Sequence, residues 1–486
     1  MPYEAPKPKP NKKEPEAKNY YFSRTHYFQA VESNECVMVE ANWFPKYSNA
    51  ESVDTFWVRR ARKYGNGNDL FLKKQKLSKT KDYHEAYYTY TDTNTNQLIN
   101  MRVILKNELI YILRANTDST RQHGKFTSEF FRSFTPSDTA IGSGIFESKA
   151  NVFFKDLYSK DKATSLSAKE AIENRDVDFL AKDDTIILRN IKAPEFHELS
   201  LSAKANIIRE LGLSKRKEIS DDLKKLFETY TDSTDIQLVI LQTLAGLKTE
   251  ASTKSLLDLL INDTPPLYDK EGAMDILYPY FDSLQLTKHL FPRLLDLTRY
   301  SEYKNAIHKL LAVAVSEKII DKDVYASYKP FLYKECKDEL KRQFSADKEE
   351  TNYSRYVDNG MYEDSKKEPA EKDVFISANE QSQKYFGNPD LYALCMLIHP
   401  FKDENIAKQL LDKMTRINNS RTKATLISYL LSENYTFPDS VLNSLAESNE
   451  SRTYWYKRLV KYEKKVCLLK KHLNQKDFAY ALLFET

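Results

Sequence analysis

Between residues 20 and 134, short runs of aromatic and β-branched residues alternate with polar positions at the two-residue period of β-strands. The run from Tyr83 to Tyr90 has aromatic side chains at both odd and even positions, so covering layers are expected on both faces of that strand. Residues 100–105 and 109–113 predict a hairpin, in which Asn107 supplies the left-handed turn residue.

Two helices are expected beside these strands. Within residues 126–134, four phenylalanines recur at the spacing of one helix face. A second helix is expected over residues 52–63. The residues on its apolar face are Val53, Phe56, Trp57 and Ala61. Both helices would cover the sheet, so residues 20–135 are expected to form a small antiparallel-sheet α/β sandwich.

From residue 200 to residue 344 the apolar positions follow the period of amphipathic helices, and the connections between stripes are short. Helix pairs recur at about 30–40 residues, which is the range of HEAT-like repeats. Each pair would expose an apolar face that only its neighbours can cover, so an α-solenoid is expected. Further helical repeats are expected over residues 379–486.

Weaker patterns separate these regions. Residues 136–199 are interpreted as a connector, with a helical stretch at 168–174 and either a strand or an extended link at 185–189. Residues 345–378 are rich in charged residues and serine, which predicts an exposed linker. Residues 1–19 alternate proline with lysine and glutamate, a composition typical of a disordered tail. The apolar segment 477–484 predicts either an inward-docking helix or a chain that continues further.

A chain of 486 residues exceeds the usual size of one hydrophobic core, so about two to four packed units are expected. Hydrophobic residues make up 41% of the chain, enough for most of it to fold. The 10 glycines disfavour a turn-dense all-β protein, and the 32 tyrosines suit amphipathic packing surfaces. The predicted class is α+β, mainly α.

The sequence gives limited information on the compartment. It contains no apolar run of about 20 residues and no apolar region near Met1, so neither a membrane span nor a secretory signal is expected. As written, the chain is expected to be cytoplasmic; as a piece of a larger exported protein, it would belong to the cell envelope. Its four cysteines are interpreted as isolated thiols, with two distant disulfides as the alternative for an exported chain. They are Cys36, Cys336, Cys395 and Cys467.

Motifs that carry chemistry are missing. No glycine begins a phosphate-binding or nucleophile-elbow motif, and the eight histidines show no metal-ligand spacing. His26, His84 and His123 share the N-terminal region, but structural roles are the simpler interpretation. The tyrosines between Tyr83 and Tyr90 are expected to pack in the sheet rather than to form a stacking platform. No catalytic, cofactor-binding or metal-ligating residue and no cofactor is therefore predicted.

Charge is nearly balanced, with 74 basic against 70 acidic residues and a net charge of +4. This balance disfavours nucleic acid as a partner. Two basic clusters, residues 59–63 and 457–471, are interpreted as solvated helix faces, with binding of a polyanion or membrane surface as the alternative.

Three segments resemble a known family. The stretches MRVILKNELIYIL (101–113) and FTSEFFRSFTP (126–136) are similar to a PsbP-like α/β domain of bacterial envelope proteins. Together with VFFKDLYSKD (152–161) and the helical repeats, they resemble the C-terminal region of long TraB/GumN-family proteins from Bacteroidota. The Gly-x-x-His motifs of that family's enzymatic domain are missing, so the resemblance implies an accessory region and transfers no catalytic residue.

These observations favour a non-enzymatic interaction scaffold that binds a protein partner through its helical repeats, with the α/β domain as a second contact surface. One alternative is an accessory region of a TraB/GumN-like envelope hydrolase. The other is an electrostatic binder of nucleic acid or a membrane surface, which would bind with a steep salt dependence.

Overall fold

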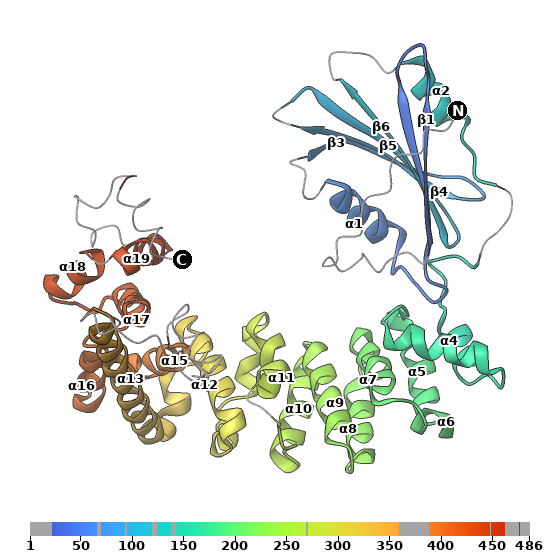
Figure 1. The fold of residues 1–486 in the computed structure, drawn as a ribbon. Coiled ribbons are helices and arrows are strands. Elements are labelled where there is room, and N and C mark those ends of the chain that lie inside the picture. The colour runs from blue at the N-terminus through green and yellow to red at the C-terminus, as the bar shows by residue number, and fades with distance from the viewer. Residues whose placement is uncertain are drawn as a thin grey trace, which may run out of the picture. The chain divides into compact units, whose positions relative to one another are not determined.

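The computed structural model describes residues 22–461, apart from 66–69, 93–94, 119–123, 138–141, 269–270, 359–387 and 448, and also describes residue 476. It divides into two compact units, residues 1–243 and 244–486. An antiparallel sheet near the start of the chain is followed by helices, so the predicted class, α+β and mainly α, is confirmed (Figure 1). The expected tail at 1–19 and the segment 477–484 lie outside the described residues.

The sheet of the first unit has six strands in the order β1-β2-β6-β5-β4-β3, and all neighbours are antiparallel. The predicted hairpin is confirmed, because β5 and β6 pair along their length and Asn107 has φ of 53° in the turn between them. The strands are β1 (Phe22–Gln29), β2 (Cys36–Trp43), β3 (Leu70–Lys79), β4 (His84–Asp92), β5 (Gln97–Lys106) and β6 (Leu109–Asp118).

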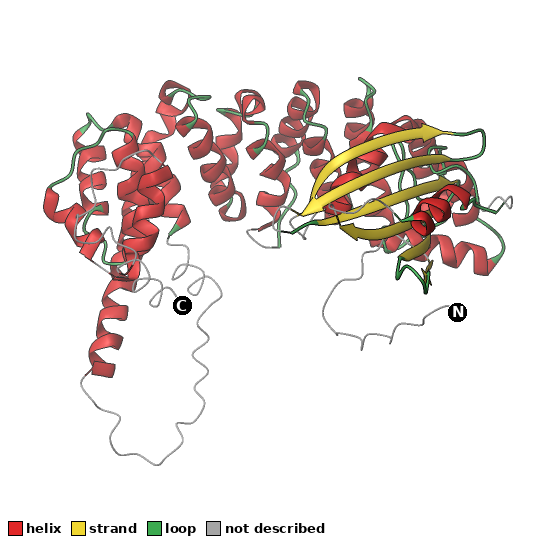
Figure 2. Ribbon diagram, turned by 90° about the horizontal axis from the view of Figure 1, so that it is seen from above, coloured by secondary structure: helices red, strands yellow, loops and turns green. Residues whose placement is uncertain are grey.

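Helix α1 (Val53–Gly65) covers one face of the sheet, where Trp57 is only 1% exposed. Two tyrosines of β4 attach to its backbone. The Tyr88 hydroxyl donates to the carbonyl of Trp57 at 3.2 Å, and the Tyr90 hydroxyl donates to the carbonyl of Ala61 at 2.7 Å. The helix expected over residues 52–63 is therefore present, and its apolar face forms part of the core. Figure 2 shows the strands of this sheet in yellow and the helices of the chain in red.

Helix α2 (Lys125–Ser133) covers the opposite face of the same sheet. Its phenylalanines pack on Val37 and Val39 of β2 and on Leu113 and Ala115 of β6. In β6 these inward positions alternate with Ile110 and Ile112, which belong to the α1 side. Helices therefore cover both faces of the sheet, α2 over β2 and β6 and α1 over β4; a second layer over β4 itself stays a prediction.

Residues 136–199 are not a simple connector. They contain α3 (Ala150–Leu157), α4 (Lys162–Glu173), α5 (Asp184–Ile191) and α6 (Pro194–His197). The expected helical stretch at 168–174 falls almost entirely within α4. The strand or extended link expected at 185–189 is wrong, because α5 buries Ile187 and Ile191 one turn apart on a helix face. A short apolar run does not distinguish a strand from a buried helix.

The first unit continues with α7 (Leu201–Glu210), α8 (Ile219–Thr229) and α9 (Thr234–Gly246), the last of which extends across the division between units.

In the second unit, successive helices pack on one another: α11 on α12, α12 on α15, α15 on α17, and α17 on α19. Trp455 is fully buried in the last of these clusters. The helices are α10 (Glu250–Asn262), α11 (Glu271–Phe281), α12 (Ser301–Ser316), α13 (Lys329–Asp358), α15 (Pro389–Ile398), α16 (Asn405–Met414), α17 (Ser420–Ser432), α18 (Asp439–Glu447) and α19 (Asn449–Lys461).

The linker expected at 345–378 is wrong for its first part, because α13 continues through Ser345 to Asp358. Lysine, glutamate and glutamine are good helix formers, so a charged composition alone does not distinguish an exposed helix from a loop. A buried network of hydrogen-bonded polar side chains also links this helix to Asn388. The Asn388 amide donates to Glu339 at 2.8 Å, and the Gln343 amide donates to Asp347 at 2.9 Å. Residues 359–378 lie outside the described residues.

Candidate interaction surfaces

The sequence offers few candidate groups, and the structure does not bring them together. His26 lies on β1 and His84 on β4, with three strands between them, while His123 is outside the described residues. Burial, together with nearby Lys79, lowers the pKa of His84, whose ring packs on Phe146. The described part of the chain holds no cluster of three metal-ligating side chains. The contact with Phe146 gives His84 a structural role, whereas structural roles for His26 and His123 stay predictions.

Two of the four tyrosines of the candidate platform, Tyr88 and Tyr90, belong to the core. Tyr88 and Tyr90 are buried under α1, and this burial raises the pKa of both hydroxyls. The sheet-packing interpretation is confirmed for these two residues. Cys36, Cys336 and Cys395 are free thiols as expected, and Cys467 lies outside the described residues. Burial also raises the pKa of Cys336 to about 12, which makes this thiol unreactive.

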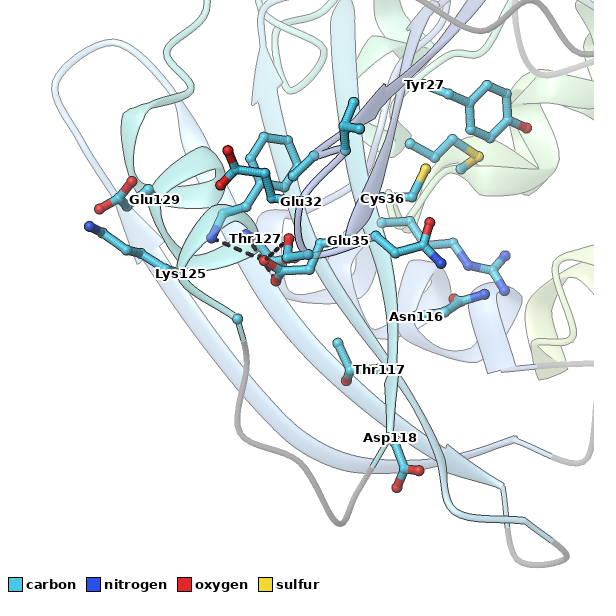
Figure 3. A pocket seen from close by; sticks show the side chains of 18 residues that line it. Tyr27, Glu32, Glu35, Cys36, Asn116, Thr117, Asp118, Lys125, Thr127 and Glu129 are labelled. Atoms are coloured by element: carbon cyan, nitrogen blue, oxygen red, sulfur yellow. Dashed lines mark hydrogen bonds between the residues drawn. The ribbon is translucent and has the colours of Figure 1, made fainter.

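A groove of about 1200 Å³ lies in the first unit, where the β1–β2 turn meets the end of β6 and the start of α2 (Figure 3). Acidic side chains line it beside Arg114 and Lys125. Those labelled in the figure are Glu32, Glu35, Asp118 and Glu129.

Glu35 has a structural task in this groove. Its carboxylate accepts hydrogen bonds from the backbone N–H groups of Phe126 and Thr127 at 3.2 and 3.4 Å, at the start of α2. Slight burial acts against ionisation, but hydrogen bonds from Thr127 and Ser33 outweigh it and hold the pKa of Glu35 below its usual range. The carboxylate also lies against Gly124, where a Cβ atom would collide with it. Glu35 therefore anchors a helix terminus rather than forming an acid-base pair.

The basic cluster at 59–63 is only partly solvated. Arg59 and Arg62 are exposed as expected, but Arg60 is buried, with its guanidinium 5.2 Å from the ring centres of both Phe44 and Phe56. The solvated-face interpretation is thus wrong for Arg60, whose charge rests on aromatic faces. Of the second cluster, residues 462–471 lie outside the described residues.

Two carboxyl groups that no sequence motif points to, those of Glu210 and Asp178, lie near each other in the first unit. Burial and the nearby Asp178 carboxyl raise the pKa of Glu210 to about 7. The burial of Asp178 likewise raises the pKa of Asp178. Glu210 ends α7 and Asp178 precedes α5, so only the tertiary fold brings them near each other. The arrangement can hold a proton near neutral pH.

The second unit exposes an aromatic ledge, which we define as Tyr328 and Phe331. Their rings stack with centres 5.5 Å apart and planes 17° apart, and Phe331 remains 61% exposed. The Tyr328 hydroxyl lies 3.0 Å from Nε2 of buried His308. This hydrogen bond holds the Tyr328 ring in place beside Phe331. The ledge borders a groove of about 360 Å³ whose other wall is formed by η4 (Arg293–Arg299) and Pro292.

A smaller cavity of about 240 Å³ between α12, α13 and α15 is lined by charges that already neutralise one another. Lys304 lies 2.8 Å from Glu335, and Lys309 lies 2.9 Å from Asp390. Burial lowers the pKa of the adjoining His308 to about 4, so its imidazole is neutral. These pairs join α12 to α13 and to α15.

Comparison with known proteins gives no family for this chain. No protein-family model matches it, and no curated protein is similar to it in sequence. The resemblance to TraB/GumN-family proteins therefore stays a prediction from the sequence. Within the described residues, no helix combines the length and apolar character that a membrane crossing requires.

Proposed function

We propose that this protein is a non-enzymatic interaction scaffold whose helices form a HEAT-like α-solenoid that binds a protein partner. The observation that carries the proposal is the exposure of Phe331 on the aromatic ledge. An aromatic ring left largely in water on a folded helix gains stability when a partner covers it. Aromatic residues are also enriched where binding energy concentrates in protein interfaces.

The surroundings of Phe331 support this assignment. Tyr328 is held from beneath by His308, so the ledge is preorganised and loses little side-chain entropy on binding. Across the groove, the Arg293 guanidinium lies 3.0 Å from Asp258 at a solvated edge, which supplies a polar rim. An apolar centre with a polar rim is the usual anatomy of a protein interface.

The helical packing supports the solenoid part of the proposal. Within the described part of the second unit, α11 packs on α12, α12 on α15, α15 on α17 and α17 on α19, which supports a stack whose helices bury their apolar stripes against one another. Such stacks present an extended surface to partners. The accessory-region and electrostatic alternatives remain predictions.

Site-specific photo-crosslinking tests the proposal. A benzophenone amino acid replaces Phe331 in the full chain, in cells that express the native gene, and a second strain carries it at Tyr278 of α11. Tyr278 is 62% exposed and therefore matches Phe331 in accessibility. We expect a discrete crosslinked protein from position 331 alone, with its yield reduced by competing unlabelled chain. Equal yields at both positions, or none at position 331, would overturn the proposal.

A further inference from the structure

Strand β3 forms one edge of the sheet, and its outer side pairs with no strand in the part of the chain that the structure describes. It is ten residues long and exposed along nearly its whole length. Three of its apolar side chains are in contact with water, with Phe71 56%, Leu72 42% and Leu77 43% exposed. A long edge with exposed apolar residues is a template for the addition of another strand.

The charge of β3 is entirely positive. Its sequence LFLKKQKLSK contains four lysines and no acidic residue. None of these lysines forms an ion pair within the described residues. Of the two acidic residues of β4, Glu85 is occupied by Arg102 at 2.8 Å and accepts a hydrogen bond from Ser78, and Asp92 lies opposite Leu70 at the start of β3. The positive charge of the edge is therefore not neutralised by its own sheet.

The register arranges these side chains by face. A bulge lies between Leu72 and Lys74, and beyond it residues 74–79 pair regularly with residues 89–84 of β4. In this regular part, Lys74 and Lys76 lie on the α2 side of the sheet, whereas Leu77 lies on the α1 side. A partner strand would therefore meet Lys74 and Lys76 on one face, and Leu77 with Lys79 at the strand end on the other.

We propose that β3 binds an extended acidic segment of a partner protein as an added antiparallel strand. Backbone hydrogen bonds would supply affinity, and carboxylates facing Lys74 and Lys76 would supply selectivity. A second copy of this chain fits less well, because self-pairing centred on Gln75 places Lys74 opposite Lys76, and like charges directly opposite are destabilising. The lysines of β3 disfavour the addition of an uncharged strand and favour the addition of an acidic strand.

This inference goes beyond the proposed function, because it assigns a different surface and a partner chemistry. The aromatic ledge and β3 belong to different units, so the crosslinking experiment and the experiment below can fail separately.

The probe is a fluorescent peptide of about ten residues, a typical strand length, in which glutamate alternates with valine. Its binding to the full chain is followed by fluorescence anisotropy at about 0.15 M salt, where long-range attraction is screened. Two comparison peptides carry lysine in place of glutamate, or N-methyl groups on alternate amides, which remove the backbone donors on one edge. We expect the acidic peptide to bind and both comparison peptides to fail.

The chain itself is then varied. We expect Lys74→Glu/Lys76→Glu to weaken binding of the acidic peptide at least about tenfold, because the new glutamates of β3 would face the glutamates of the peptide. The matched control is Lys160→Glu/Lys162→Glu, which reverses two exposed charges with the same spacing outside the sheet and should bind normally. Amide exchange along β4 verifies that each variant keeps the β3–β4 ladder.

Four outcomes would overturn the inference. Equal binding of the N-methylated peptide would show charge attraction without strand addition. Equal binding by the Lys74→Glu/Lys76→Glu variant, or no binding by the parent chain, would remove β3 as the site. Self-association of the parent chain that depends on Lys74 and Lys76 would assign the edge to a second copy instead.

Discussion

The guanidinium of Arg102 on β5 lies 2.8 Å from the carboxylate of Glu85 on β4, and the same guanidinium donates to the carbonyl of Phe134 at 2.8 Å. It also donates to the carbonyl of Phe131. One buried cation, only 4% exposed, therefore neutralises a buried acid and satisfies carbonyl groups at the end of α2. This residue fastens α2 to the sheet.

Removal of Arg102 should loosen α2. In Arg102→Met, the Glu85 charge stays buried without its partner, so we expect a loss of about 3–5 kcal/mol of unfolding free energy. Urea unfolding combined with amide exchange in residues 125–134 measures it. The control Arg132→Met removes an exposed charge from the same helix and should change stability by less than about 0.5 kcal/mol. Equal behaviour of the two variants would contradict the assigned role.

Glu210 should make the first unit less stable as pH rises. Its pKa is raised to about 7 in the folded chain from 4.5, so its stabilising contribution is complete below pH 4.5 and is lost as pH rises through 7. A shift of this size corresponds to about 3 kcal/mol. We expect Glu210→Gln to flatten the pH dependence of exchange in α7 and α8, whereas Glu228→Gln, an exposed control, leaves it unchanged. An unaltered slope in Glu210→Gln would refute the prediction.

His308 should have the opposite effect on the second unit. Its pKa is lowered to about 4 from 6.5, so its contribution is present above pH 6.5 and is lost as pH falls through 4, again by about 3 kcal/mol. Amide exchange in α12 between pH 4 and 7 measures the loss. We expect His308→Gln to reduce it, while His289→Gln on η3 (Leu284–His289) does not. His399, whose pKa is also about 4, contributes a residual slope.

Gly142 should resist substitution. It has φ of +68°, and a Cβ atom there would meet the carboxylate of Glu108, which lies 2.6 Å from the buried ammonium of Lys149. We expect Gly142→Ala to cost about 1–3 kcal/mol through backbone strain and displacement of this ion pair. In contrast, Gly246→Ala in α9 has open space around the new atom and should stabilise by about 0.5–1 kcal/mol. Thermal unfolding of the two variants makes the comparison.

The sequence predicts best where one periodic pattern decides the structure. The β5–β6 hairpin, the apolar face of α1 and the phenylalanines of α2 follow from spacing alone, because each buries a single regular stripe. The run 185–189 and residues 345–358 were expected to be non-helical and are helical, since β-branched or charged composition is outweighed there by tertiary packing and helix propensity.

The candidate surfaces were harder to predict for a physical reason. Phe331 lies in a helical stripe where most apolar residues are buried, so its exposure becomes apparent only once η4 and α13 are placed. Glu210 and Asp178 are far apart in sequence and carry no motif. The lysines of β3 are visible in the sequence, but their meaning depends on the strand order, which puts β3 at the edge.

Each of the two units contains one tryptophan that is sealed from water, Trp57 under the sheet and Trp455 among the last helices. Indole emission shifts to longer wavelengths when water reaches the ring, so the chain carries an optical reporter in each half. With the half-buried Trp43 replaced by phenylalanine, a variant retaining only Trp57 or only Trp455 would signal the opening of one unit. The emission wavelengths of the two variants, followed during unfolding, would then show which unit unfolds first.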